Sequence, residues 1–113
     1  ENSLPNFHLY FLFRLTEYLG FLPDTKNICE DGWFDLQKGT VEQLKPVHPY
    51  YLDKEATKLL CSLAGLKLRD IGNLKISRTM RNYLTIKLLD YYQLHFEHLG
   101  EIKSLKILQE VFS

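Results

Sequence analysis

The longest stretch with the pattern of a single helix lies in the last third of the chain, from about Arg78 to Glu97. No proline or glycine interrupts it. Its apolar residues recur at helical spacing: Met80, Tyr83, Leu84, Ile86, Leu88, Tyr91 and Leu94. Ser77 can cap this helix, because its hydroxyl can accept a hydrogen bond from an unpaired first-turn amide. After a break at Gly100, a second candidate cap, Ser104, predicts a short last helix over about 105–112 that folds back.

A first helix is predicted from about Pro5 to Leu19, since proline suits a first turn and Gly20 can adopt a left-handed ending. Its apolar residues cover most of the cylinder: Phe7, Leu9, Tyr10, Phe11, Leu12, Phe13, Leu15, Tyr18 and Leu19. A helix that is apolar on nearly every side is either buried or shared between a core and a second partner. We expect one face to lie in this core and the other against another domain or protein.

Between Pro23 and Pro49 the helical pattern gives way to short runs typical of strands. Residues 33–36 and 40–42 flank Lys38-Gly39, which predicts a hairpin, and the residues around Pro49 should be extended. A further helix is expected from about 53 to 64, followed by a short helical turn over 69–73. The predicted fold is mainly α, a single domain over 1–113. It has about four helices, with a short β-hairpin insertion between the first and second main helices.

Length and charge narrow the function classes. With 113 residues the chain can form one domain with a sizeable core. Its 14 cations balance 14 anions, and this formal net charge of zero argues against nucleic-acid binding as the main role of this domain. No apolar run approaches a membrane span and no signal peptide opens the chain, so a cytoplasmic location is expected. No phosphate loop, nucleophile elbow or repeated carboxylate pair is visible, so we do not expect an enzyme.

One segment concentrates positive charge. Between positions 67 and 87 there is a single acid, Asp70, among six cations: Lys67, Arg69, Lys75, Arg78, Arg81 and Lys87. One interpretation is a solvated face that pairs with the acidic hairpin, where Glu30, Asp31 and Asp35 are expected to be solvated. The other is a patch for phosphates or an acidic peptide, which Lys103 and Lys106 would extend.

Several of these segments together resemble the C-terminal helical domain of the RecO family of recombination mediators, of the Bacteroides type. The resemblance rests on the Arg78-x-x-Arg81 opening of the long helix, its Tyr91-Tyr92 end, and Ile102-Lys103-Ser104-Leu105 near the terminus. It also rests on residues 13–21 and 34–40 and spans nearly the whole chain. It implies a role in DNA repair, with an N-terminal OB-fold, absent from this sequence, as the main contact for single-stranded DNA.

The resemblance also implies partners and a metal site. RecO proteins work with RecR and with single-stranded-DNA-binding protein, whose acidic tail ends in an aromatic residue. For that tail we predict a pocket formed by Phe11, Arg14, Leu15, Tyr18, Arg81 and Lys103, and for weak DNA binding Lys75, Arg78, Arg81 and Lys87. The alternative is a helical protein-interaction scaffold unrelated to DNA.

Many RecO proteins carry a four-cysteine zinc site in the hairpin region. This chain has only Cys29 there, and one further cysteine, Cys61. We therefore expect no cofactor, with Trp33 and Phe34 anchoring the hairpin by packing and both cysteines reduced. His95 and His98 would supply two ligands at most, so a capping or surface role is expected for them.

Overall fold

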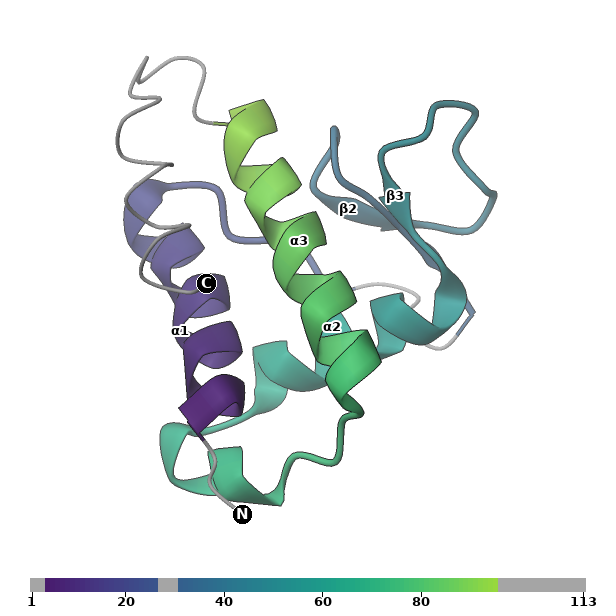
Figure 1. Ribbon diagram of the computed structural model, residues 1–113. Helices are drawn as coiled ribbons and strands as arrows, with labels where there is room; N and C mark the ends of the chain where they lie inside the picture. Colours follow the sequence, from purple (N-terminus) through teal and green to yellow (C-terminus); the bar gives the residue numbers. More distant parts are fainter. Residues whose placement is uncertain (1–3, 27–30, 96–113) are drawn as a thin grey trace.

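The computed structural model describes residues 4–26 and 31–95 (Figure 1). Its elements in chain order are α1 (Leu4–Leu19), β1 (Trp33–Asp35), β2 (Thr40–Glu42), β3 (Tyr51–Leu52), α2 (Lys54–Gly65), the 3-10 helix η1 (Leu68–Asn73) and α3 (Arg78–His95). The predicted fold, mainly helical with a small antiparallel β insertion between the first two main helices, is confirmed. The predicted last helix over 105–112 lies outside the described residues.

The helix boundaries follow from local capping. Asp53 accepts a hydrogen bond from the Ala56 amide (2.8 Å) at the start of α2, and Ser77 Oγ accepts from the Met80 amide (3.0 Å) at the start of α3. Gly20 ends α1 with a φ of 94°, as predicted from its freedom in the left-handed region. The amides of Gly20 and Phe21 both donate to the Thr16 carbonyl, which completes this ending.

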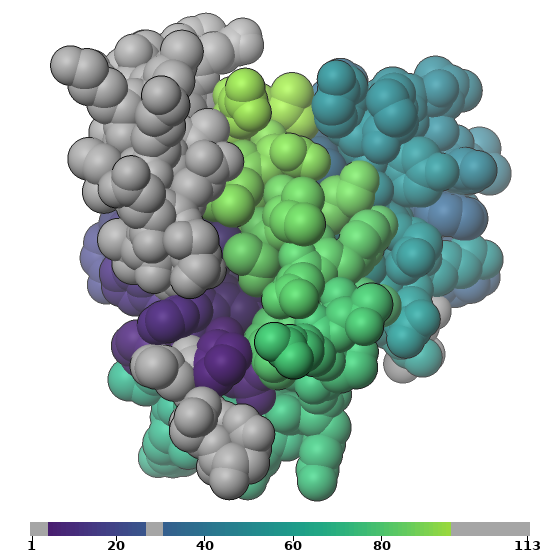
Figure 2. All heavy atoms as spheres, in the orientation of Figure 1, coloured from purple at the N-terminus to yellow at the C-terminus, as the bar shows by residue number. Residues whose placement is uncertain are grey.

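The sheet contains one strand more than the hairpin expected from the sequence. Its order is β2-β1-β3 and both pairs are antiparallel. Because side chains alternate across a strand, Phe34, Val41 and Leu52 all point to the inner face, where they are buried in the core. In Figure 2 the atoms of α3 and of the sheet segment meet along one continuous surface.

Helices α1 and α3 lie side by side, and α2 contacts both of them and the sheet (Figure 1). Their shared core holds residues from every layer: Leu9, Leu12, Phe13, Phe34, Leu36, Val41, Leu52, Ala56, Leu60, Leu63, Leu84, Leu88, Tyr91 and Tyr92. All of these side chains are almost fully buried. The domain therefore has one hydrophobic core, built from helices and sheet together.

The last turns of α3 are joined by side chains to three distant segments. The Tyr91 hydroxyl donates to the Phe21 carbonyl, the Tyr92 hydroxyl to Leu12 (2.6 Å), and His95 Nε2 to Leu36 (2.8 Å). Burial raises the pKa of both tyrosines far above its usual value, so both hydroxyls remain donors. The expected capping or surface role of His95 is thus wrong: the ring is half-buried and holds α3 to the residue after β1. His98 lies outside the described residues.

The hairpin is organised around Asp35, which was expected to be solvated but is buried. Its carboxylate accepts hydrogen bonds from the amides of Gln37 (2.9 Å) and Lys38 (3.0 Å) and from His48 Nε2 (3.1 Å). Gly39 follows with a φ of 75°, and a Cβ there would lie 3.1 Å from the Tyr91 hydroxyl. Glycine is therefore required at this turn for its backbone conformation and for the close approach of α3.

Candidate partner-binding surfaces

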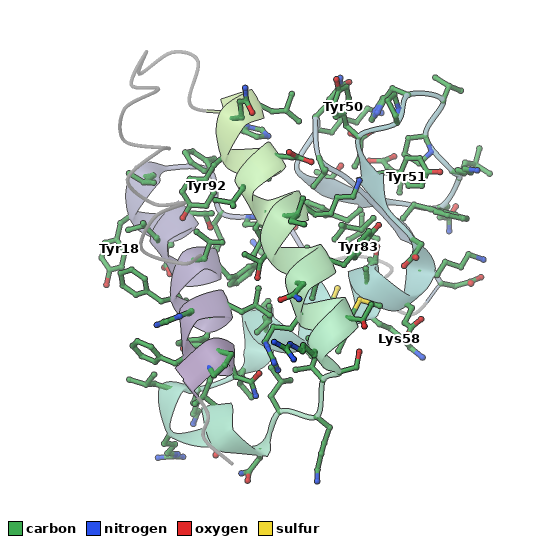
Figure 3. The ribbon with its side chains drawn as sticks, in the orientation of Figure 1. Tyr18, Tyr50, Tyr51, Lys58, Tyr83 and Tyr92 are labelled. Atoms are coloured by element: carbon green, nitrogen blue, oxygen red, sulfur yellow. The ribbon has the colours of Figure 1, made fainter. Side chains whose placement is uncertain are left out.

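A groove of about 610 Å³ opens between α2 and the N-terminal turns of α3. Leu59, Ile76 and Met80 form its apolar part. Lys58, labelled in Figure 3, and Lys75 bring positive charge to it, and Glu55 is the acid among its lining residues. The groove thus combines an apolar floor with two ammonium groups, the combination that an acidic peptide with an apolar anchor requires.

Of the two lysines, the sequence singled out only Lys75, as part of the cation-rich segment. Lys58 lies on α2, outside that segment, so a search along the chain for clustered cations does not find it. The available signal is helical spacing, because Lys54, Lys58 and Ser62 recur every four residues. That signal gives the helix face but not the groove, which depends on how α3 crosses α2.

The other predicted DNA-binding cations lie in different surroundings. Arg78 is exposed in the first turn of α3. Arg81 is half-buried, and its Nη1 donates to Asn6 Oδ1 (3.2 Å), while Asn6 Nδ2 donates to the Leu74 carbonyl (3.3 Å). Arg81 therefore joins α3 to the start of α1 through an amide. Lys87 lies over the ring of Tyr83 at 5.6 Å from its centroid.

Arg14, predicted to contact the acidic tail, is directed toward α2. Its Nη2 donates to the Ala64 carbonyl (2.7 Å), and its Nη1 lies 3.6 Å from a carboxylate oxygen of Glu17. The side chain also lines a second cavity, of about 280 Å³, between α1, the end of α2 and residues 22–26. The structure therefore engages Arg14 and Arg81 with different segments and does not bring them together. Lys103 lies outside the described residues.

The apolar members of the predicted pocket follow the outer side of α1. Phe11 is 44% exposed and Tyr18 86% exposed, and Phe7 stacks beside Phe11 with ring centroids 6.3 Å apart. Leu15 is half-buried against the core. Neither of the two cavities described above is lined by Phe11, Leu15 or Tyr18. This side of α1 is therefore an exposed aromatic stripe, as expected for a helix with a second apolar face.

A further surface, not anticipated from the sequence, covers the outer face of the sheet. Trp33 and Tyr51 meet edge to face, with centroids 5.7 Å apart. Lys45 Nζ lies 5.9 Å from the Trp33 centroid and 5.5 Å from that of Tyr51, and Lys54 Nζ lies 5.6 Å from Trp33. Lys54 also pairs with Asp31 at 2.8 Å, which holds the pKa of that carboxyl below its usual value.

Among the described residues, no three or more His, Cys, Asp or Glu side chains are placed to hold a metal ion. The absence of zinc stays a prediction. Cys61 is disulfide-bonded, so the expectation of a reduced thiol is wrong at that position; Cys29 lies outside the described residues. In the part of the chain that the structure covers, no helix has the length and apolarity to cross a membrane.

Comparison with known proteins assigns the family. Residues 1–106 match the family model "Recombination protein O C terminal". Relatives named DNA repair protein RecO come from Azobacteroides pseudotrichonymphae (31% identity over 112 residues) and Phocaeicola vulgatus (32% over 113). A third comes from Christiangramia forsetii (35% over 111). These alignments cover 99%, 100% and 98% of this chain.

The same alignments cover 46%, 47% and 46% of the three relatives, so the chain spans about half the length of the curated relatives it matches. No solved structure gives a significant match. The family match extends over nearly all of the chain, including every described helix and strand. The chain belongs to the RecO C-terminal domain family.

Proposed function

We propose that this domain is the interaction module of a recombination mediator in DNA repair, which acts in recombinase loading and strand annealing. In this role it docks the acidic tail of single-stranded-DNA-binding protein and contributes weakly to DNA binding. RecR is a further partner, and an OB-fold of the kind the resemblance implies provides the main contact with single-stranded DNA. The proposal is supported by the family match and by relatives named DNA repair protein RecO.

The observation that carries the docking proposal is the groove between α2 and α3. An aromatic side chain at the end of a tail would lie on Leu59, Ile76 and Met80, and carboxylates beside it would meet Lys58 and Lys75. The groove also opens at the N-terminus of α3, where the helix dipole favours negative charge. Among the described residues that line the groove, Glu55 is the acid, and it would disfavour a carboxylate at one position and so help to set the register.

A labelled acidic tail peptide, titrated against the domain by fluorescence anisotropy, tests this proposal. We expect binding in the micromolar range, typical of a short segment that must be ordered as it docks. Replacing both Lys58 and Lys75 by Ala should weaken binding about tenfold or more, since two charge-assisted contacts are lost. The matched control is Lys38→Ala, an exposed lysine on the hairpin, which should bind as the wild type does.

Two further comparisons distinguish the possible outcomes. A peptide that lacks its terminal aromatic residue should bind much more weakly, because the apolar floor of the groove would stay empty. If Arg14→Ala or Arg81→Ala weakens binding and the double lysine variant does not, the tail docks beside α1 and the groove assignment is wrong. If the wild type does not bind the intact peptide, tail docking is wrong, while the membership of the RecO family is unaffected.

A further inference from the structure

The outer face of the sheet is more aromatic than the fold requires. Strand alternation directs Phe34 and Leu52 inward to the core and leaves Trp33 and Tyr51 on the opposite face. Both outward rings are only half-buried. They meet edge to face as a diagonal pair on neighbouring strands, 5.7 Å apart at 78°. Two large rings thus cover an open side of the sheet while remaining accessible to solvent.

The aromatic surface continues from the sheet onto α3. Tyr83 lies on α3, where burial and then the charges of Asp53 and Tyr51 raise the pKa of its hydroxyl. Figure 3 shows Tyr51 on the sheet and Tyr83 on the side of α3 that faces the sheet and the start of α2. We call these three residues, which come from β1, β3 and α3, the aromatic row: Trp33, Tyr51 and Tyr83.

Each ring of the aromatic row has a lysine ammonium group within 6 Å of its centroid. Lys45 reaches Trp33 and Tyr51 from the loop between β2 and β3, Lys54 reaches Trp33 from the start of α2, and Lys87 reaches Tyr83 along α3. Lys45 and Lys54 are exposed, and all three heads lie on flexible four-carbon stems. Each ammonium group can therefore move from its ring to a nearby anion without any change in the backbone.

We propose that the aromatic row is a stacking surface for single-stranded nucleic acid, with Lys45, Lys54 and Lys87 as its phosphate contacts. The inference rests on the DNA contact in the proposed function and assigns a site for it. Bases would stack on the half-buried rings of Trp33 and Tyr51 in place of the lysine ammonium groups, each of which moves to a phosphate. Of the four cations predicted from the sequence, Lys87 is the member that this site shares.

Nearby acids limit how strongly such a site can bind. Asp31 pairs with Lys54, Glu42 lies opposite Trp33 in the strand register, and Asp53 is engaged in capping α2. Binding should therefore be weak and should be lost at moderate salt, because few net counterions are released. Stacking is less sensitive to salt and supplies the part of the binding that requires bases. An acidic peptide would satisfy the lysines but would make no use of three ring faces.

The chain provides its own probe, since Trp33 is its one tryptophan. Titration with an oligothymidylate at low salt should quench the fluorescence of Trp33, because a stacked base is in direct contact with the indole. An abasic strand of equal length carries phosphates without bases and should give little quenching. Polyglutamate should give none. Equal quenching by polyglutamate would make this an acidic-peptide surface and would overturn the proposal.

Two variants test the residues. Tyr51→Ala should weaken oligothymidylate binding about tenfold, whereas Tyr18→Ala, the same change on the exposed stripe of α1, should leave it unchanged. Lys45→Gln changes an exposed side chain, so folding is not at risk; it should weaken binding and lower the salt slope by about one. Circular dichroism of each variant verifies folding.

Anisotropy of a labelled oligonucleotide separates this inference from the proposed function. If the strand binds by anisotropy while Trp33 fluorescence stays constant, the DNA contact stands and the aromatic row is the wrong site. If neither signal changes, the DNA contact fails, and this inference with it. The tail-peptide titration uses another ligand and another groove, so its result is independent of both.

Discussion

The outer side of α1 and the outer face of the sheet both expose aromatic rings, yet within residues 4–26 and 31–95 they differ in the cations placed over those rings. On α1, Phe7 stacks on Phe11, and the helix's one Arg or Lys, Arg14, is directed away to Ala64. Its guanidinium lies over Tyr10 and Phe13, at 5.6 and 5.5 Å. On the sheet, lysine heads lie over Trp33 and Tyr51 themselves.

This difference separates two kinds of contact. Rings that mainly contact other rings, as Phe7 contacts Phe11, suit an apolar partner that buries them, because buried area is then the main gain. Rings with mobile cations suit a ligand that alternates flat apolar groups with negative charge, as a nucleic-acid strand does. Exposure of aromatic residues alone therefore does not reveal the type of partner. The position of the nearest cation does.

The largest expected effect contrasts the two sides of α1. Phe13→Ala removes a fully buried ring from the core and should lower the free energy of unfolding by about 3–5 kcal/mol. Phe11→Ala removes a ring that is 44% exposed and should cost about 1 kcal/mol or less. Urea unfolding followed by circular dichroism measures both. Equal losses would mean that the outer stripe of α1 is part of the fold and not a surface for a partner.

A smaller loss of stability is expected at Arg14, the cation of α1 that points toward α2 and away from the outer rings. Arg14→Ala leaves the Ala64 carbonyl without its 2.7 Å donor and should destabilise the domain by about 1–2 kcal/mol. Glu17→Ala, which removes only the exposed 3.6 Å ion pair, should cost about 0.5 kcal/mol or less. The melting temperatures of the two variants show whether Arg14 stabilises the fold or serves only to bind a ligand. An Arg14→Ala domain of unchanged stability would favour the latter.

The smallest expected effect is that of a chelator on the sheet. The hairpin is held by the burial of Phe34 and by the hydrogen bonds to Asp35, so no folding energy should come from a metal. Addition of EDTA should leave the melting temperature unchanged, and elemental analysis should find no stoichiometric zinc. About one zinc per chain, with a lower melting temperature after chelation, would refute this prediction.

Features encoded in short segments could be predicted from the sequence. Ser77, Gly20 and Gly39 mark a helix start, a helix end and a turn through their own backbone or side-chain chemistry, and each acts as expected. The third strand was missed because Tyr51–Leu52 is only two residues long. Its pairing with β1 depends on contacts that no periodicity over two residues can show.

Features that depend on distant segments were not accessible in this way. Arg14 and Arg81 are bonded to groups 50 and 75 residues away, a backbone carbonyl and an amide, which no charge pattern along the chain identifies. The groove requires Lys58 and Lys75 to meet across two helices. The aromatic row likewise joins residues from β1, β3 and α3. Cation-rich segments indicate which charges are available, whereas the fold decides which of them remain available to a ligand.

The three bonds at the end of α3 also bear on how the protein is made. They join residues 70, 80 and 59 positions apart, so α1 and the hairpin acquire these partners only after residues 91–95 have been synthesised. At synthesis rates of roughly 5–20 residues per second, about 4 to 16 seconds separate the synthesis of α1 from that of the last turns of α3. During that interval the side of α1 that packs on α3 lacks this partner. Newly made chains of this domain should therefore be most prone to aggregation before the last turns of α3 have been synthesised, because the apolar surface of α1 that α3 covers is still exposed.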